Sequence, residues 1–455
     1  MAGIVADHLH LRFAPAKFSA PRKVSTSLLW TSLFALFLLA GLALRLWLAT
    51  RQIRHVAQHR NAVPQDFAGR IPLAAHQRAA DYTVAKTRFG IFEMAWSAAA
   101  VLGWTLLGGL DLLNNALLNQ LGGGMWQQLA LLGCFALISG AIELPLSYYQ
   151  TFVIEQRFGF NQMTRGMWLS DLLKSTLVGT AIGLPLAALI LWLMGAAGSM
   201  WWLWAWCVWM GFNLVLMVVY PLFIAPLFNQ FKPLDDESLA ARVTALMKRC
   251  GFAAKGLFVM DGSRRSAHAN AYFTGFGAGK RVVFYDTLLK QLSPEEVEAV
   301  LAHELGHFKH RHITRRIVGM FVISLAGFAL LGWLATKGWF YAGLGVVPNF
   351  SMPGVEGSAP NDALALLLFM LAAPIFSVFL SPLFAQVSRR HEFEADAFAV
   401  AQTQGGDLAS ALLKLHEDNA STLTPDPVYV KFYYSHPPAI ERLARIPYSA
   451  STSAA

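Results

Sequence analysis

The sequence predicts a mainly α-helical, multi-pass membrane protein with a small α+β region between its membrane spans. Of its 455 residues, 55% are hydrophobic and only 14% are charged, whereas a soluble protein usually carries about 25% charged residues. The hydrophobic residues gather into runs of about 20, a length that crosses a bilayer as a helix. A more polar stretch, 228–313, separates the fifth of these runs from the sixth.

Seven apolar runs are candidate membrane spans. The first covers 28–48, and a secretory signal peptide is the alternative for it. A signal peptide usually has an apolar core of about 7–15 residues, but this run is longer and leads into Arg51 and Arg54, so we expect a retained span. The other six runs lie at 92–112, 127–147, 170–195, 200–227, 316–336 and 363–385.

The distribution of Lys and Arg predicts the orientation in the membrane. Residues 49–91 contain seven of them and residues 228–313 contain twelve, whereas 113–126 contain none. Because basic residues concentrate in cytoplasmic loops, we expect 49–91, 148–169, 228–313 and the C-terminal segment in the cytoplasm. The N-terminus then lies outside, although 1–26 carries four basic residues. The net charge of +9 fits this topology better than nucleic-acid binding, because no basic run is interleaved with aromatic residues.

We expect the chain to divide at the polar stretch. The expected parts are 1–227 with five spans, 228–313 as a cytoplasmic α+β insert, 314–387 with two spans, and 388–455 as a C-terminal helix and cytoplasmic tail. Within the insert, a helix should run from about 233 to Cys250. Alternating and β-branched residues predict strands at 256–260, 271–277 and 281–285.

The helix that follows these strands has a well-marked start. Ser293 is a suitable N-cap, Pro294 suits the first helical position, and Glu296 completes a capping box. Apolar residues then recur at helical spacing, at Val297, Val300, Leu301 and Leu305. One face of this helix can therefore pack against the hydrophobic core while another face carries polar groups.

That other face carries an H-E-x-x-H motif formed by His303, Glu304 and His307. Residues four apart lie on one face of a helix, so the two imidazoles can bind one metal ion. In zinc peptidases the glutamate of this motif is the general base. A surface helix with two unrelated histidines is the alternative.

A catalytic zinc site usually has three protein ligands, and the third is expected near 388–397. Glu392 and Asp396 are four apart there, so one carboxylate can bind the metal while the other accepts a hydrogen bond from the ring N–H of a ligating histidine. We expect His391 and Glu394 to point elsewhere. The alternative is a surface helix whose acids pair with neighbouring arginines.

Two further histidine segments need interpretation. His310 follows closely after the motif, but a third ligand on the same straight helix strains tetrahedral geometry, and we expect 309–316 to be a basic membrane-interface collar. His436 precedes two prolines that fix its backbone, so it could hydrogen-bond an oxyanion or simply cap the helix that begins at Ala439.

With these segments in place, the chain resembles the type I CAAX prenyl proteases, which are integral-membrane zinc metalloendopeptidases. The likeness covers most of the chain. It is carried by 151–155, 158–161, 220–221, 224–228, 266–273, 286–288, 303–307, 388–396, 436–438 and 441–442.

The resemblance implies seven membrane helices around a large water-filled chamber, with one zinc ion per chain at its cytoplasmic end. The implied metal ligands are His303, His307 and Glu392. The implied catalytic residues are Glu304, Asp396 and His436. The implied substrate-binding residues are Asn270 and Ala271, which would lie on a strand edge that holds an extended peptide.

We therefore expect a zinc-dependent membrane endopeptidase that cleaves near the C-terminus of prenylated CAAX-type peptides, in contact with membrane lipid. Two alternatives stay open: a membrane-protein quality-control peptidase without a prenyl requirement, and a transporter or channel with a structural zinc site. The chain ends in Ser-Thr-Ser-Ala-Ala at 451–455, without the endoplasmic-reticulum retention signal often ascribed to eukaryotic members. We expect the bacterial inner membrane if the source is bacterial, and the endoplasmic-reticulum membrane otherwise.

Overall fold

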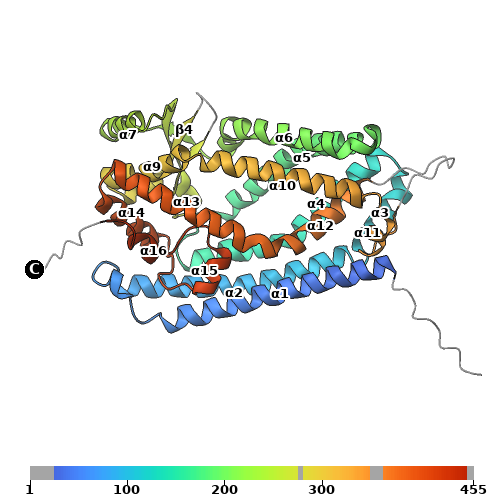
Figure 1. The fold of residues 1–455 in the computed structure, drawn as a ribbon, viewed down its shortest axis with the longest axis horizontal. Coiled ribbons are helices and arrows are strands. Elements are labelled where there is room, and N and C mark those ends of the chain that lie inside the picture. The colour runs from blue at the N-terminus through green and yellow to red at the C-terminus, as the bar shows by residue number, and fades with distance from the viewer. Residues whose placement is uncertain (1–24, 275–279, 349–361, 448–455) are drawn as a thin grey trace, which may run out of the picture.

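A computed structural model describes residues 25–274, 280–348 and 362–447 and shows a mainly helical protein (Figure 1). Within these residues, six helical segments are long and apolar enough to cross a membrane, and a bent helix pair brings the number to seven if it forms one span. This agrees with the seven predicted runs. The six segments are α1 (Thr26–Gln58), α4 with the π-turn after it (Met125–Glu155), α5 (Arg165–Ala196), the segment around α6 (Gly198–Leu227), α10 (His312–Leu334) and the segment of α12 and α13 (Asp362–Gln402).

The predicted run at 92–112 is not one continuous helix. It comprises the end of α2 (Leu73–Trp104) and the start of α3 (Gly109–Leu121), which are bent by 45°. Two glycines explain the break. Gly108 has a φ of +80°, and a Cβ on Gly109 would lie 2.5 Å from the carbonyl oxygen of Gly103.

The helices lie roughly along one long direction, with the sheet at one end (Figure 1). Helices α1 and α2 pack together along one side, and α5 and α6 pack together along the opposite side, where α6 also contacts α10. Helix α11 (Gly338–Ala342) lies with α3 at the end away from the sheet (Figure 1).

The insert contains a four-stranded sheet in the order β1-β2-β4-β3. The three predicted strands are present as β2 (Gly256–Met260), β3 (Ala271–Thr274) and β4 (Arg281–Tyr285), and the rest of the second predicted strand lies outside the described residues. The structure adds β1 (Phe231–Pro233), which is too short and too rich in polar and proline residues for its pattern to reveal it. Helices α7 (Glu237–Arg249) and α8 (Asp286–Gln291) complete the insert.

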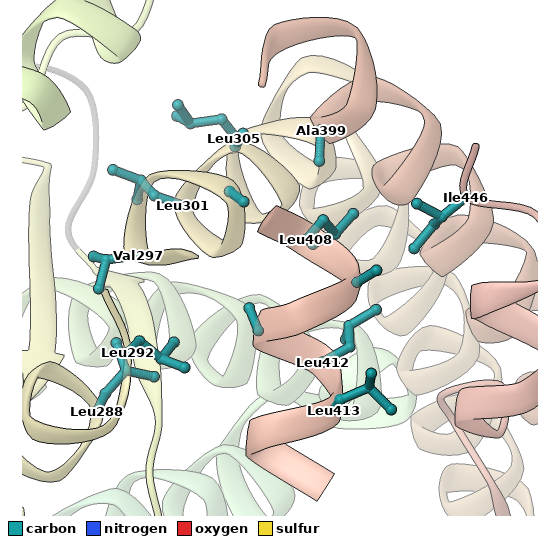
Figure 2. Packing of buried hydrophobic residues seen from close by; sticks show 14 of the residues in the cluster. Leu288, Leu292, Val297, Leu301, Leu305, Ala399, Leu408, Leu412, Leu413 and Ile446 are labelled. Carbon is teal, nitrogen blue, oxygen red and sulfur yellow. The ribbon is translucent and has the colours of Figure 1, made fainter. Parts of the chain in front are cut away.

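Helix α9 (Pro294–Lys309) has the predicted capping box between Ser293 and Glu296. The apolar face of α9 belongs to the main hydrophobic core at this end of the molecule. Figure 2 shows Leu301 and Leu305 of α9 in the same hydrophobic cluster as Leu408 of α14 (Gly405–Asp418). The core therefore fixes which face of α9 is left for the histidines.

The C-terminal segment returns to the first helix. Asp426 caps the start of α15 (Pro427–Tyr433), forms an ion pair with Arg51 at 3.0 Å, and donates its backbone N–H to Gln52 Oε1 at 2.7 Å. Helix α16 (Ala439–Leu443) follows. Between α1, α2, α14 and α15 lies a cavity of about 1090 Å³, and His436 is part of its wall. We refer to this space, whose wall extends from Arg45 on α1 to Arg442 on α16, as the internal cavity.

The expected division at 227/228 falls in the short connection between η5 (Ala225–Leu227) and β1, and the division at 313/314 falls at the start of α10. The expected boundary at 387/388 lies inside α13 (Ser381–Gln402). The helix that should bind the metal is therefore continuous with a membrane-spanning segment. The four-part division itself stays a prediction.

Candidate metal centre and active site

The site is built where α9 crosses α13, and Gly306 controls this crossing. A Cβ at Gly306 would lie 2.9 Å from Ala395 Cα and 3.1 Å from Ala395 O. Real Cβ atoms essentially never approach closer than 3.0 Å. The glycine inside the H-E-x-x-H motif therefore allows the two helix backbones to approach closely enough for their polar side chains to meet.

Three side chains converge at this crossing. His303 Nε2 lies 3.3 Å from His307 Nε2, 3.4 Å separate His303 Nε2 from Glu392 Oε2, and 3.3 Å separate His307 Nε2 from Glu392 Oε1. Among the described residues these three form the only group of His, Cys, Asp or Glu that could hold a metal ion. The structure brings together the three side chains that the resemblance implies as ligands, and His310 does not join them.

The chemistry of this group fits a divalent metal ion. Glu392 is only 4% exposed, and its Oε2 atom is buried without a hydrogen-bond partner among the described residues. A buried carboxylate oxygen that lacks a hydrogen bond is costly, and a cation between the three side chains would satisfy it. Two imidazole nitrogens and one carboxylate are a donor set that catalytic zinc takes.

A carboxylate and an arginine fix the orientation of His303. Its Nδ1 lies 2.8 Å from Asp396 Oδ1, so Nε2 is left for a metal. Arg442, which is 7% exposed, holds Asp396 through two hydrogen bonds of 2.8 and 2.5 Å. Burial disfavours the charged imidazole of His303, but its hydrogen bond to Asp396 and its closeness to the Glu392 carboxylate outweigh this effect and raise the pKa of His303 to about 9. A metal ion that binds at Nε2 has to displace that proton.

A second series of hydrogen-bonded side chains orients His307, and the sequence analysis did not predict it. His307 Nδ1 lies 3.1 Å from His312 Nδ1, and His312 Nε2 lies 2.9 Å from Glu394 Oε2. When His307 binds a metal through Nε2, its Nδ1–H can donate to His312, whose Nε2–H can donate to Glu394. The expectation that 309–316 is only an interface collar is therefore wrong for His312, which is 3% exposed.

As expected, His391 and Glu394 are not among the three converging side chains, but they have a contact that the sequence did not reveal. Neither belongs to the metal group, yet both contact His312. The His391 ring stacks on the His312 ring with centroids 4.0 Å apart.

Glu304 adjoins His303 in α9, and His436 lies beside Glu392. Glu304 is half-buried next to His303, and within the described part of the chain it has no hydrogen bond or ion pair. His436 Nε2 lies 3.4 Å from Glu392 Oε1, and its ring opens onto the internal cavity. Burial lowers the pKa of His436, which favours the neutral ring at neutral pH.

Asn270 and Ala271 lie where β3 forms one edge of the sheet. Tyr285 N–H donates to the Asn270 carbonyl at 3.0 Å, so Asn270 faces β4. In an antiparallel pair the next residue turns its backbone groups the other way, and Ala271 therefore presents N–H and C=O to the open edge. The Asn270 side chain currently accepts that N–H at 2.8 Å.

A bundle of apolar helices with a two-histidine, one-carboxylate centre and a free glutamate beside it defines the class of membrane metallopeptidases. Comparisons with known proteins agree. Residues 52–230 match the model described as the CAAX prenyl protease N-terminal region with five membrane helices, and residues 233–450 match peptidase family M48. The boundary between the two matches lies close to the predicted start of the insert.

Relatives match along most of their length. CAAX prenyl protease 1 of Saccharomyces cerevisiae is 32% identical over 92% of this chain and 95% of its own. The Arabidopsis thaliana homologue of CAAX prenyl protease 1 is 37% identical over 79% of this chain and 80% of its own. The crystal structure of Ste24p from S. mikatae has a TM-score of 0.85 and 30% identity, and covers 94% of this chain and 100% of that one. This chain belongs to the CAAX prenyl protease family of M48 peptidases, and it is a multi-pass membrane metalloendopeptidase.

Proposed function

We propose that this protein uses one zinc ion to hydrolyse a peptide bond near the C-terminus of prenylated CAAX-type peptides. The observation that carries the proposal is the convergence of His303, His307 and Glu392 beside a glutamate without a partner. A three-ligand set leaves a position for water, whereas a structural zinc site is normally closed by four ligands. The names of the relatives support the substrate class. The excess of Lys and Arg in 228–313 supports a cytoplasmic location of the site.

Glu304 is the proposed general base. When bound, zinc would polarise the substrate carbonyl and acidify a water molecule. Glu304 takes a proton from the attacking water and delivers it to the leaving amine. Its lack of a competing partner among the described residues leaves both of its oxygens available.

The other polar residues orient a metal ligand, stabilise the oxyanion and hold the substrate. Asp396 keeps His303 in the tautomer that frees Nε2. His436 donates a hydrogen bond to the oxyanion from the internal cavity side. The open edge of β3 at Asn270 and Ala271 pairs with the substrate backbone and holds it extended.

The test of this mechanism is Glu304→Gln. We expect the variant to lose peptide cleavage by at least about 100-fold, as expected for removal of a general base, while it keeps the wild-type zinc content, measured by elemental analysis. Glu392→Ala is the matched comparison, because it should lose the metal as well. Turnover retained in Glu304→Gln would remove Glu304 from this role.

The substrate class needs its own assay. The purified wild-type protein is given one CAAX peptide in farnesylated and unmodified forms, with and without a zinc chelator. We expect chelator-sensitive cleavage that favours the farnesylated form. Equal cleavage of the two forms would support the quality-control alternative instead, and zinc occupancy without any cleavage would support a structural site.

A further inference from the structure

Arg45 is a cation in the internal cavity without an acidic partner. It lies in the membrane-spanning helix α1, and its side chain lines the internal cavity. Its Nε–H donates to the Gly41 carbonyl at 3.2 Å, which uses one of its five N–H groups. Within the described part of the chain no ion pair involves Arg45. An arginine at membrane depth is costly and marks a functional site by default.

The other cations of the cavity wall are already engaged. Arg442 is held by Asp396 through two hydrogen bonds. Lys86 lies 3.8 Å from Glu155 and donates to the Tyr82 hydroxyl at 3.2 Å. Arg45 is thus the cavity-lining cation whose guanidinium has donors to spare for a bound anion.

The position of Arg45 along α1 indicates how long a ligand must be to reach from the His436 segment to Arg45. Gln52 on α1 is bonded to the backbone of Asp426, and it also contacts Tyr434, two residues before His436. Arg45 lies seven residues from Gln52, which corresponds to about 10 Å along a helix. The Arg45 backbone therefore lies about 10 Å along α1 from Gln52, which contacts the segment that carries His436.

A CAAX sequence has three residues after its cysteine. Three extended residues span about 10 Å, so a peptide cleaved on the carboxyl side of that cysteine would bring its C-terminal carboxylate to a cation at this distance. We propose that Arg45 binds the free C-terminal carboxylate of the substrate, and later of the released tripeptide, and so measures the distance from the chain end to the scissile bond. This inference rests on the proposed function and deepens it.

The experiment compares two farnesylated CAAX peptides that differ only in the C-terminal group, a free carboxylate or an amide. For the wild-type protein we expect kcat/KM to be at least tenfold higher with the carboxylate. Arg45→Gln should lose this preference: kcat/KM falls at least tenfold with the carboxylate peptide and less than twofold with the amide. Arg45→Lys should retain part of the preference. Turnover of the amide peptide reports that each variant is folded.

The matched control is Arg54→Gln, which removes an exposed arginine from the same helix outside the cavity wall and should leave both rates unchanged. A second readout is inhibition by the tripeptide product, which Arg45→Gln should weaken at least tenfold for the acid and not for its amide. Equal wild-type rates with both peptides, or equal losses with both in Arg45→Gln, would overturn the assignment while the proposed function stands. Failure of the wild type to cleave either peptide would overturn the proposed function and this inference with it.

Discussion

Replacing Gly306 by alanine tests whether the spacing between α9 and α13 sets the geometry of the metal centre. The added Cβ would lie 2.9 Å from Ala395 Cα, a backbone atom that no side-chain rotation can move. The gap between the helices must widen by about 0.5 Å to reach the 3.4 Å of ordinary contact. Because α9 carries His303 and His307 and α13 carries Glu392, the distances between the two histidines and Glu392 increase when the helices move apart.

A displacement of this size exceeds what a metal site tolerates, since ligand distances are normally held within about 0.2 Å. Gly306→Ala should therefore lower metal affinity by roughly 10–100-fold, the range seen when the support of a ligand is lost, with a loss of unfolding free energy of about 1–3 kcal/mol from overpacking. Competition with a graded series of chelators measures the affinity, and peptide cleavage measures the activity.

The matched control is Gly319→Ala on α10, where a Cβ would meet nothing within 4 Å. This change should leave metal affinity unchanged and slightly stabilise the helix, because alanine favours helix over glycine by about 1 kcal/mol. The reasoning would be refuted if Gly306→Ala bound zinc with wild-type affinity, or if the two alanine variants behaved alike.

Two further predictions concern the groups that orient the histidines. Asp396→Asn should weaken metal binding roughly 10–100-fold. The amide removes the carboxylate that pairs with buried Arg442, and it no longer favours one tautomer of His303. Unchanged metal affinity in a chelator competition would contradict this role. Glu394→Gln should weaken binding less, by roughly tenfold at most, because Glu394 acts on His307 only through His312. A larger loss for Glu394→Gln than for Asp396→Asn, measured the same way, would reverse the proposed order of the two supports.

The membrane-spanning helices could be predicted because their signal is compositional. A run of about 20 apolar residues is long enough to cross a bilayer as a helix, so length and hydrophobicity alone predict the six to seven candidate spans. The break between α2 and α3 could not be read in the same way. The break depends on a positive φ at Gly108 and on contact between Gly109 and the backbone of Gly103. The hydrophobicity of a run contains no information about either feature.

The sequence alone determined helix α9 and its phase. The capping box at Ser293 and Glu296 sets the start, and the apolar period buries Leu301 and Leu305, so His303 and His307 have to share the remaining face. These are local effects, decided by 3.6 residues per turn and by which face leaves water.

Only the tertiary structure decided which acid joins the two histidines and what supports each one. Glu392 and Asp396 share a helical face, so their spacing does not distinguish their roles. Arg442, from a distant helix, forms two hydrogen bonds with Asp396 but lies 3.9 Å from Glu392 Oε2, which has no hydrogen bond among the described residues. His312 returns to the site because Arg311 adopts a left-handed conformation, with φ of 56°, between α9 and α10. A non-glycine residue takes that conformation only when surrounding packing compensates for its strain, and such packing is a property of the folded chain that no local pattern records.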